Sequence, residues 1–201
     1  MKTKTKKFEF YSETLKAALE KHAEKHNTTV DNVLEVCNYL ARGEMAFVPH
    51  YEEAFVAGDE KEDPFIHVDY KSRLNREGRS ANCTWYHDFK DLDPGDVPWQ
   101  DVAKINPRDA KGFGIKNGDR VKLTSPTGSL TCTASLWEGV RPGTIAKCYG
   151  QGHWSYGRVA SKEFGKVPRG GSSNDLIPAQ YDRLSGSTAF YATTRIKIEK
   201  V

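Results

Sequence analysis

The chain has 201 residues, of which 37% are hydrophobic and 28% charged, which suits one substantial core or a core with a small appendage. No apolar run approaches the roughly 18 residues of a membrane span, and the basic first residues lead into charged sequence, so we expect neither direct membrane insertion nor a secretory signal in this chain. The net charge of +3 is too balanced for a generic nucleic-acid-binding protein.

Residues 1–51 predict an N-terminal helical segment. Ser12 can cap a first helix, because the apolar residues that follow it recur every three or four positions. Thr28 or Thr29 can cap a second helix, which we expect to end at Gly43 and to face five apolar side chains inward: Val30, Val33, Leu34, Cys37 and Leu40. Neither helix carries convergent functional groups, so both are interpreted as packing elements.

Residues 52–63 are acidic and lack periodicity, which predicts a linker, and residues 64–201 are assigned to a second domain. In this domain a strand is predicted over 64–70 and a loop over 90–100. Charge also divides the chain: residues 1–100 carry 14 basic and 19 acidic side chains (net −5), and residues 101–201 carry 16 and 8 (net +8). The positive second half favours an anionic ligand.

The second half predicts short strands joined by tight turns. Asn106 followed by Pro107 is typical of a helix start, so a short helix is expected there. Residues 120–124 and 129–136 alternate like strands around the turn at 125–128, which predicts a hairpin, and 144–149 predicts a further strand. Together these elements indicate a small, mostly β barrel.

The four cysteines stand alone in the sequence, with separations of 46, 49 and 16 residues. Zinc ribbons and iron–sulfur clusters need closely paired thiolates, so neither is expected within this chain. All four are predicted to be reduced and structural. Cys132 and Cys148, inside predicted strands, are expected to be buried.

Two glycine-rich segments follow the last of these strands. Residues 150–157 carry His153 and Trp154 among three glycines, and glycine lets backbone amides approach a ligand closely. A surface turn in which Trp154 plugs the barrel end explains this segment equally well. Residues 168–176 combine Arg169 with glycine, serine and asparagine, a composition that can hold a phosphate or a purine edge but is also ordinary for a loop.

Several motifs occur in an order that resembles one protein family. They include 105–110 (Ile-Asn-Pro-Arg-Asp-Ala), 114–121 (Gly-Ile-Lys-Asn-Gly-Asp-Arg-Val), 125–128, 140–143 and 150–154, with further matches at 7–12, 79–82, 174–176 and 182–186. This set resembles the C-terminal dinucleotide-binding domain of the molybdopterin oxidoreductases, the dimethyl sulfoxide reductase family. Within it, residues 69–73 and 150–157 look most like respiratory arsenate reductase catalytic subunits, with thiosulfate, polysulfide and tetrathionate reductases as close relatives.

The resemblance implies a double-psi β-barrel over residues 64–201 that binds molybdenum bis(molybdopterin guanine dinucleotide). It also implies a C-terminal fragment, inactive alone, of a longer catalytic subunit whose 4Fe-4S cluster lies in the missing N-terminal part. The implied partners are the remainder of that subunit and an iron–sulfur electron-transfer subunit, without nucleic acid. The implied location of the parent enzyme is the periplasm or the outer face of the cytoplasmic membrane.

The resemblance also suggests roles for residues of the first glycine-rich segment. Gly152, His153 and Trp154 are predicted to line the pterin side of the cofactor. His153 near a pterin can influence the protonation and electronics of that ring.

Five further residues are predicted to contact the same cofactor. Arg79, Ser80 and Asn82 are expected at the pterin or the diphosphate, with Arg79 as a charge-assisted donor. Asn174 and Asp175 are expected to bind polar ring edges. The alternatives are turn-forming side chains for the two asparagines and a solvated charge for Arg79.

Two other functions remain open from the sequence. A non-enzymatic double-psi barrel that binds protein partners predicts an exposed apolar patch and no affinity for pterin nucleotides. Nucleic-acid binding, suggested by the basic second half and its aromatic residues, predicts an affinity that falls steeply with salt. The aromatic residues alternate with glycines rather than with a basic stripe, which disfavours the second alternative.

Overall fold

The computed structural model describes residues 1–53, 55–152, 170–187 and 194–201. His153 and Trp154 lie outside these ranges. The chain forms two compact units: one spans Met1–Ala54 with Gln180–Ala189, and the other spans Phe55–Ala179 with Phe190–Val201. No helix among the described residues is long and apolar enough to cross a bilayer.

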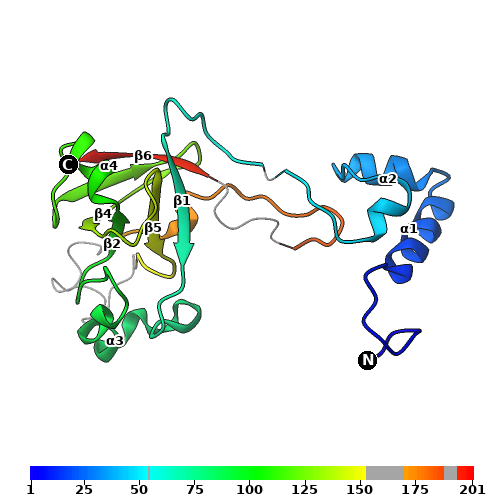
Figure 1. Ribbon diagram of the computed structural model, residues 1–201, viewed down its shortest axis with the longest axis horizontal. Coiled ribbons are helices and arrows are strands. Elements are labelled where there is room, and N and C mark those ends of the chain that lie inside the picture. The colour runs from blue at the N-terminus through cyan, green and yellow to red at the C-terminus, as the bar shows by residue number, and fades with distance from the viewer. Residues whose placement is uncertain (54, 153–169, 188–193) are drawn as a thin grey trace. The chain divides into compact units, whose positions relative to one another are not determined.

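The first unit contains the predicted pair of helices (Figure 1). Helix α1 (Glu13–Lys25) begins at Ser12, whose side chain accepts a hydrogen bond from the amide of Leu15. Helix α2 (Val30–Val36) begins at Thr29, whose side-chain hydroxyl accepts a hydrogen bond from the amide of Asn32. Both helices pack with the 3-10 turn η1 (Gly43–Phe47) around Leu19, Leu34, Ala46 and Phe47.

The predicted end of the second helix at Gly43 is wrong. Helix α2 stops at Val36, because Asn38 adopts a left-handed conformation with φ of 57°. The amide of Asn38 bonds to the carbonyl of Glu35, and the amide of Tyr39 bonds to that of Leu34, which together make a Schellman C-terminus. Leu40, expected to face inward, is 70% exposed as a result.

The second unit is a closed barrel, whose strands run in the order β1-β5-β2-β4-β3-β6. Strands β1 and β5 pair in parallel, as do β2 and β4, and the other four pairings are antiparallel. This arrangement confirms the predicted mostly β, double-psi type of fold. The strands are short: β1 (Phe65–Tyr70), β2 (Val102–Ile105), β3 (Arg120–Thr124), β4 (Ser129–Leu136), β5 (Thr144–Cys148) and β6 (Arg195–Lys200).

Helices and 3-10 turns connect these strands. The predicted helix after Asn106 is present as α4 (Pro107–Gly112). The loop expected over 90–100 includes one 3-10 turn. That turn is η3 (Lys90–Leu92), and the further connecting elements described are η2 (Arg76–Asn82), α3 (Thr84–Asp88) and η4 (Ser173–Asp175).

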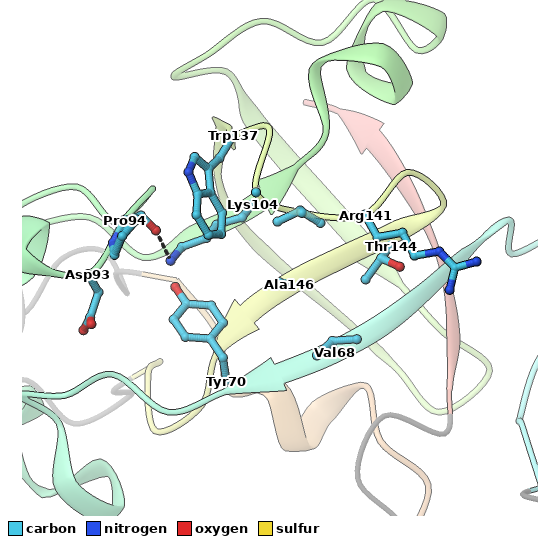
Figure 2. A pocket seen from close by; sticks show the side chains of 11 residues that line it. Val68, Tyr70, Asp93, Pro94, Lys104, Trp137, Arg141, Thr144 and Ala146 are labelled. Atoms are coloured by element: carbon cyan, nitrogen blue, oxygen red, sulfur yellow. Dashed lines mark hydrogen bonds between the residues drawn. The ribbon is translucent and has the colours of Figure 1, made fainter.

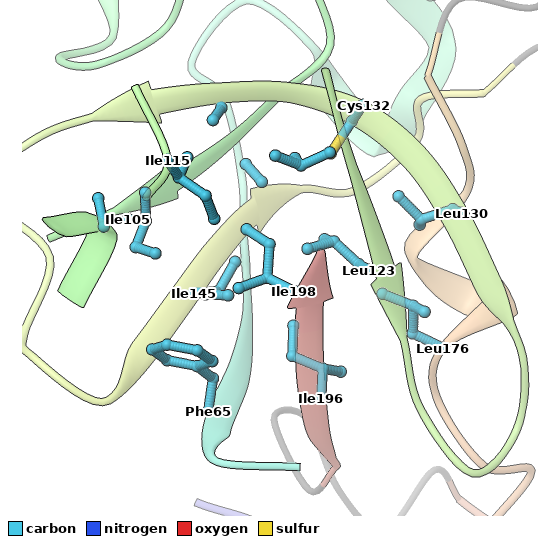
Figure 3. Close-up of a cluster of buried hydrophobic side chains, with 14 residues drawn as sticks. Phe65, Ile105, Ile115, Leu123, Leu130, Cys132, Ile145, Leu176, Ile196 and Ile198 are labelled. Carbon is cyan, nitrogen blue, oxygen red and sulfur yellow. The ribbon is translucent and has the colours of Figure 1, made fainter. Parts of the chain in front are cut away.

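Aliphatic side chains that alternate along the strands fill the barrel (Figure 3). Ile105, Leu123, Ile145 and Ile196 have no exposed surface. Burial of each such side chain contributes about 1.5–3 kcal/mol. Leu176, directly after η4, belongs to the same core and anchors that turn to the barrel.

The described cysteines are free thiols, as predicted, and Cys132 and Cys148 are buried. Burial raises the pKa of Cys132 to about 12, which keeps this thiol protonated at neutral pH.

His67 on β1 gives the protein a pH-dependent stability. Its side chain is fully buried, neither ring nitrogen has a hydrogen-bond partner among the described residues, and Asp69 Oδ1 lies 3.7 Å from Nε2. Burial lowers the pKa of His67, with the Lys147 charge acting in the same direction and Asp69 opposing it. The unfolded chain therefore takes up this proton at a higher pH than the folded chain does.

We expect His67 to reduce the free energy of unfolding by up to about 1.4 kcal/mol per pH unit below its unfolded pKa of about 6.5, until the folded pKa is reached. His67→Leu should remove this component, so the variant gains stability relative to the wild type between pH 7.5 and 5.5. Urea unfolding followed by tryptophan fluorescence at each pH measures this difference in the free energy of unfolding, because all four tryptophans belong to the barrel unit. Parallel pH profiles for the two proteins would contradict the assignment.

Candidate functional site

Glycines bring three distant segments of the barrel unit into backbone contact. A Cβ on Gly150 would lie 2.4 Å from the Cα of Gly78, and a Cβ on Gly152 would lie 2.4 Å from the carbonyl carbon of Gly171. Distances below 3 Å leave no room for a side chain at either position. We call Gly78, Gly150, Gly152 and Gly171 the glycine junction.

The first segment of the junction is shaped by Asn75, which is fully buried. Its Oδ1 accepts a hydrogen bond from the amide of Ser80 at 3.0 Å, and its Nδ2 donates to the carbonyl of Tyr149 at 3.4 Å. One side chain therefore fixes the start of η2 and ties it to the segment that leads into Gly150. Gly78 has a φ of 72°, which glycine adopts without strain.

The second segment is held by Gln151, whose side chain points into the protein. Its Nε2 donates to the hydroxyl of Tyr86 on α3 at 2.9 Å, and its Oε1 accepts from the ammonium of Lys90 at 3.4 Å. Lys90 also donates to the carbonyl of Gln100. Burial lowers the pKa of Lys90, and the nearby carboxylates of Asp101 and Asp96 partly offset this effect.

The third segment is held by Asp101, which directly precedes β2. Its Oδ1 lies 2.8 Å from the Nζ of Lys147, and its Oδ2 accepts from the amide of Gly171 at 3.0 Å. Burial acts to lower the pKa of Lys147, but Asp101, together with the nearby Cys132 and Cys148, outweighs burial and holds that pKa above its usual value. The ammonium is therefore charged although Lys147 has no exposed surface.

Six of the eight predicted site residues lie on segments that meet at this junction. Arg79 and Asn82 are exposed on η2, and Ser80 between them is 9% exposed. Gly152 belongs to the junction itself. On η4, which begins directly after Ser172, Asn174 is exposed and Asp175 is half-buried. The predictions for His153 and Trp154 fall outside the described residues.

Sequence reasoning missed the buried polar residues that support the junction: Asn75, Lys90, Asp101, Lys147 and Gln151. One signal was available for Lys147. It is two residues after Ile145 in a strand whose alternate positions face the core, so a lysine there implies a buried partner. The other four carry no comparable pattern.

A separate pocket lies on the outer face of β1 and β5 (Figure 2). Its volume is about 370 Å³, and its walls include Val68, Tyr70, Lys104, Trp137, Val140 and Ala146. The ammonium of Lys104 lies 4.0 Å from the ring centre of Tyr70 and 5.2 Å from that of Trp137, and 2.9 Å from Asp96 Oδ1. None of the six predicted site residues that the structure describes lines this pocket.

Within the described residues, no group of three or more histidine, cysteine, aspartate or glutamate side chains could hold a metal ion. The polar side chains exposed on the segments that meet at the junction include one arginine, Arg79, and two carboxamides, Asn82 and Asn174. These groups suit the phosphates and ring edges of an organic anion.

Two curated proteins are similar to this chain over almost its whole length. The chain is 62% identical over 200 residues to the arsenate respiratory reductase molybdopterin-containing subunit of Shewanella sp. (strain ANA-3), covering 100% of this chain and 23% of that protein. It is 63% identical to the corresponding subunit of Chrysiogenes arsenatis, covering 98% of this chain and 24% of that protein. The chain thus spans about a quarter of the length of these curated relatives.

Among solved structures, acetylene hydratase from Pelobacter acetylenicus is similar to this chain, with a TM-score of 0.54 and 18% sequence identity. The similarity covers 84% of this chain and 22% of the hydratase chain. This likeness shows a shared fold. Residues 77–194, more than half of the chain, match the family described as "Molydopterin dinucleotide binding domain". The chain belongs to this molybdopterin dinucleotide-binding domain family.

Proposed function

We propose that this chain is the dinucleotide-binding part of a molybdenum-dependent respiratory reductase that reduces arsenate. The observation that carries the proposal is the identity of 62% and 63% to two arsenate respiratory reductase subunits, which extends over essentially all of this chain. Identity of this extent does not favour the alternative of a non-enzymatic interaction module.

The ligand proposed for the junction is bis(molybdopterin guanine dinucleotide), an anion with diphosphates and flat rings. The junction fits such a group because its closely packed glycines bring together segments that carry Arg79, Asn82 and Asn174 at the surface. In this proposal Arg79, Ser80 and Asn82 bind pterin or diphosphate, and Asn174 and Asp175 bind ring edges. Gly152, with His153 and Trp154, lines the pterin side.

The molybdenum group, when bound, supplies the two-electron oxygen-atom transfer that converts arsenate to arsenite. The task of this chain is to bind and orient that group. The hydrogen bonds of Asn75, Gln151 and Asp101 hold the three segments of the junction in place, so that little reorganisation is needed when an anion binds, which is the advantage of a preorganised site.

The proposal extends to the surrounding assembly. The remainder of the catalytic subunit carries a 4Fe-4S cluster, and a separate iron–sulfur subunit delivers electrons. The complex works in the periplasm or on the outer face of the cytoplasmic membrane. The isolated chain has no turnover.

A segment exchange tests the proposal. The 200 matching residues of the Shewanella relative are replaced by this chain, giving what we call the grafted enzyme. We expect it to contain molybdenum, to release about two guanine nucleotides per molybdenum on acid hydrolysis, and to reduce arsenate with a reduced viologen dye.

Two further proteins complete this test. The relative with the segment deleted is the negative control, and Arg79→Ala in the grafted enzyme is expected to lower the nucleotide content. A folded grafted enzyme without guanine nucleotide would refute the binding role. Full nucleotide content without arsenate reduction would refute the assignment to arsenate.

A further inference from the structure

The buried ion pair of Asp101 and Lys147 has a feature that an ordinary structural ion pair lacks. Each carboxylate oxygen has a different partner: Oδ1 binds the Lys147 ammonium, and Oδ2 accepts the amide of Gly171. Both side chains are almost completely excluded from solvent: the Lys147 side chain is 0% exposed and that of Asp101 is 3% exposed. The charge of Asp101 is thus balanced from within the barrel, while its second oxygen holds a loop of the junction.

The contact with Gly171 sets the position of the whole third segment. Gly170 approaches so closely that a Cβ would lie 1.7 Å from Asp101 Oδ2, and a Cβ on Gly171 would lie 2.4 Å from Leu130 Cβ. At the other end of the segment Leu176 is buried in the core. Residues 172–175 are therefore held at both ends, with Asn174 exposed between them.

Stability alone does not account for this arrangement. Replacing a buried ion pair by apolar residues of similar shape is often neutral or favourable for stability, because the two charges no longer have to be desolvated. A second buried pair, Lys104 with Asp96 at 2.9 Å, lies in the same barrel unit beside the pocket, and within the described part of the chain no hydrogen bond or ion pair joins it to the glycine junction. The two pairs can thus be compared directly.

We propose that Asp101 is a positioning residue for the dinucleotide site, because its Oδ2 fixes the amide of Gly171 and so the segment that carries Asn174 and Asp175. Lys147 binds the other carboxylate oxygen and so orients Asp101 toward that amide. The inference rests on the proposed function and deepens it.

The test uses the grafted enzyme with pairs of substitutions that remove both charges together. D101N/K147Q keeps a carbonyl oxygen for the Gly171 amide and gives the new carboxamides each other as partners. D101L/K147M has similar shapes but offers no acceptor. D96L/K104M removes the other buried pair and is the matched control.

We expect D101N/K147Q and D96L/K104M to keep guanine nucleotide within about twofold of the unmodified grafted enzyme. D101L/K147M should lose roughly tenfold in nucleotide content per folded protein. Hydrogen exchange of residues 170–176 in the 201-residue chain should accelerate in D101L/K147M alone.

The outcomes separate the two proposals. An unmodified grafted enzyme without nucleotide would refute the proposed function. With nucleotide present there, equal contents in D101L/K147M and D101N/K147Q would overturn the positioning role. A D101L/K147M protein that fails to fold while D101N/K147Q folds would show a structural contact instead, and would overturn it as well.

Discussion

A methyl group added at Gly152 should be far more damaging than one added at Gly143. Both glycines are in the left-handed region, with φ of 78° and 79°, so the backbone strain of an alanine, about 1–2 kcal/mol, is common to both. The surroundings differ. In the part of the chain that the structure describes, a Cβ on Gly143 meets no atom within 4 Å, whereas on Gly152 it would lie 2.4 Å from the backbone of Gly171 and Ser172.

Backbone atoms cannot rotate away as a flexible side chain can, so Gly152→Ala must separate the second and third segments of the junction. We expect Gly152→Ala to lower the free energy of unfolding by more than about 4 kcal/mol, against about 1–2 kcal/mol for Gly143→Ala. Urea unfolding of the 201-residue chain measures the difference.

The same two variants in the grafted enzyme report on binding. Gly143→Ala should keep its guanine nucleotide, and Gly152→Ala should lose most of it. Equal stability losses in the two variants would mean that close backbone approach at the junction contributes nothing beyond the left-handed strain.

The barrel was predictable because its signals are local. Alternation of apolar residues marks β3 and β4, a proline–glycine turn joins them, and Asn106 with Pro107 starts α4. The end of α2 shows the limit of such reasoning. Asn38 and Gly43 both adopt a left-handed conformation, and the helix ends at Asn38, which comes first along the chain.

The supports of the junction were not predictable, because each joins residues that are far apart in sequence. Asp101 meets Lys147 across 46 residues and Gly171 across 70, and Asn75 meets Tyr149 across 74. A buried polar side chain needs a partner, but a single sequence does not say which one. The glycine-rich composition indicated the loops of the site, whereas the groups that hold them emerge only from the fold.

Asn75 allows stability and binding to be separated, because the barrel unit contains a close counterpart. Asn106 is also buried; its Oδ1 accepts from the amide of Arg108 at 3.0 Å, and its Nδ2 donates to the carbonyl of Val140 at 2.8 Å. Each asparagine thus accepts one backbone hydrogen bond and donates another. Asp101, which precedes β2, binds the junction, whereas Asn106 follows the other end of that strand.

Asn75→Leu and Asn106→Leu each preserve shape and leave one backbone amide and one carbonyl without a partner. We expect each to lower the free energy of unfolding by about 2–4 kcal/mol. Only Asn75→Leu frees η2 from the segment leading into Gly150, so it alone should reduce guanine nucleotide in the grafted enzyme, by roughly tenfold or more. If both variants lost nucleotide in proportion to stability, Asn75 would matter to the fold alone; if neither did, the placement of Arg79, Ser80 and Asn82 at the cofactor would be wrong.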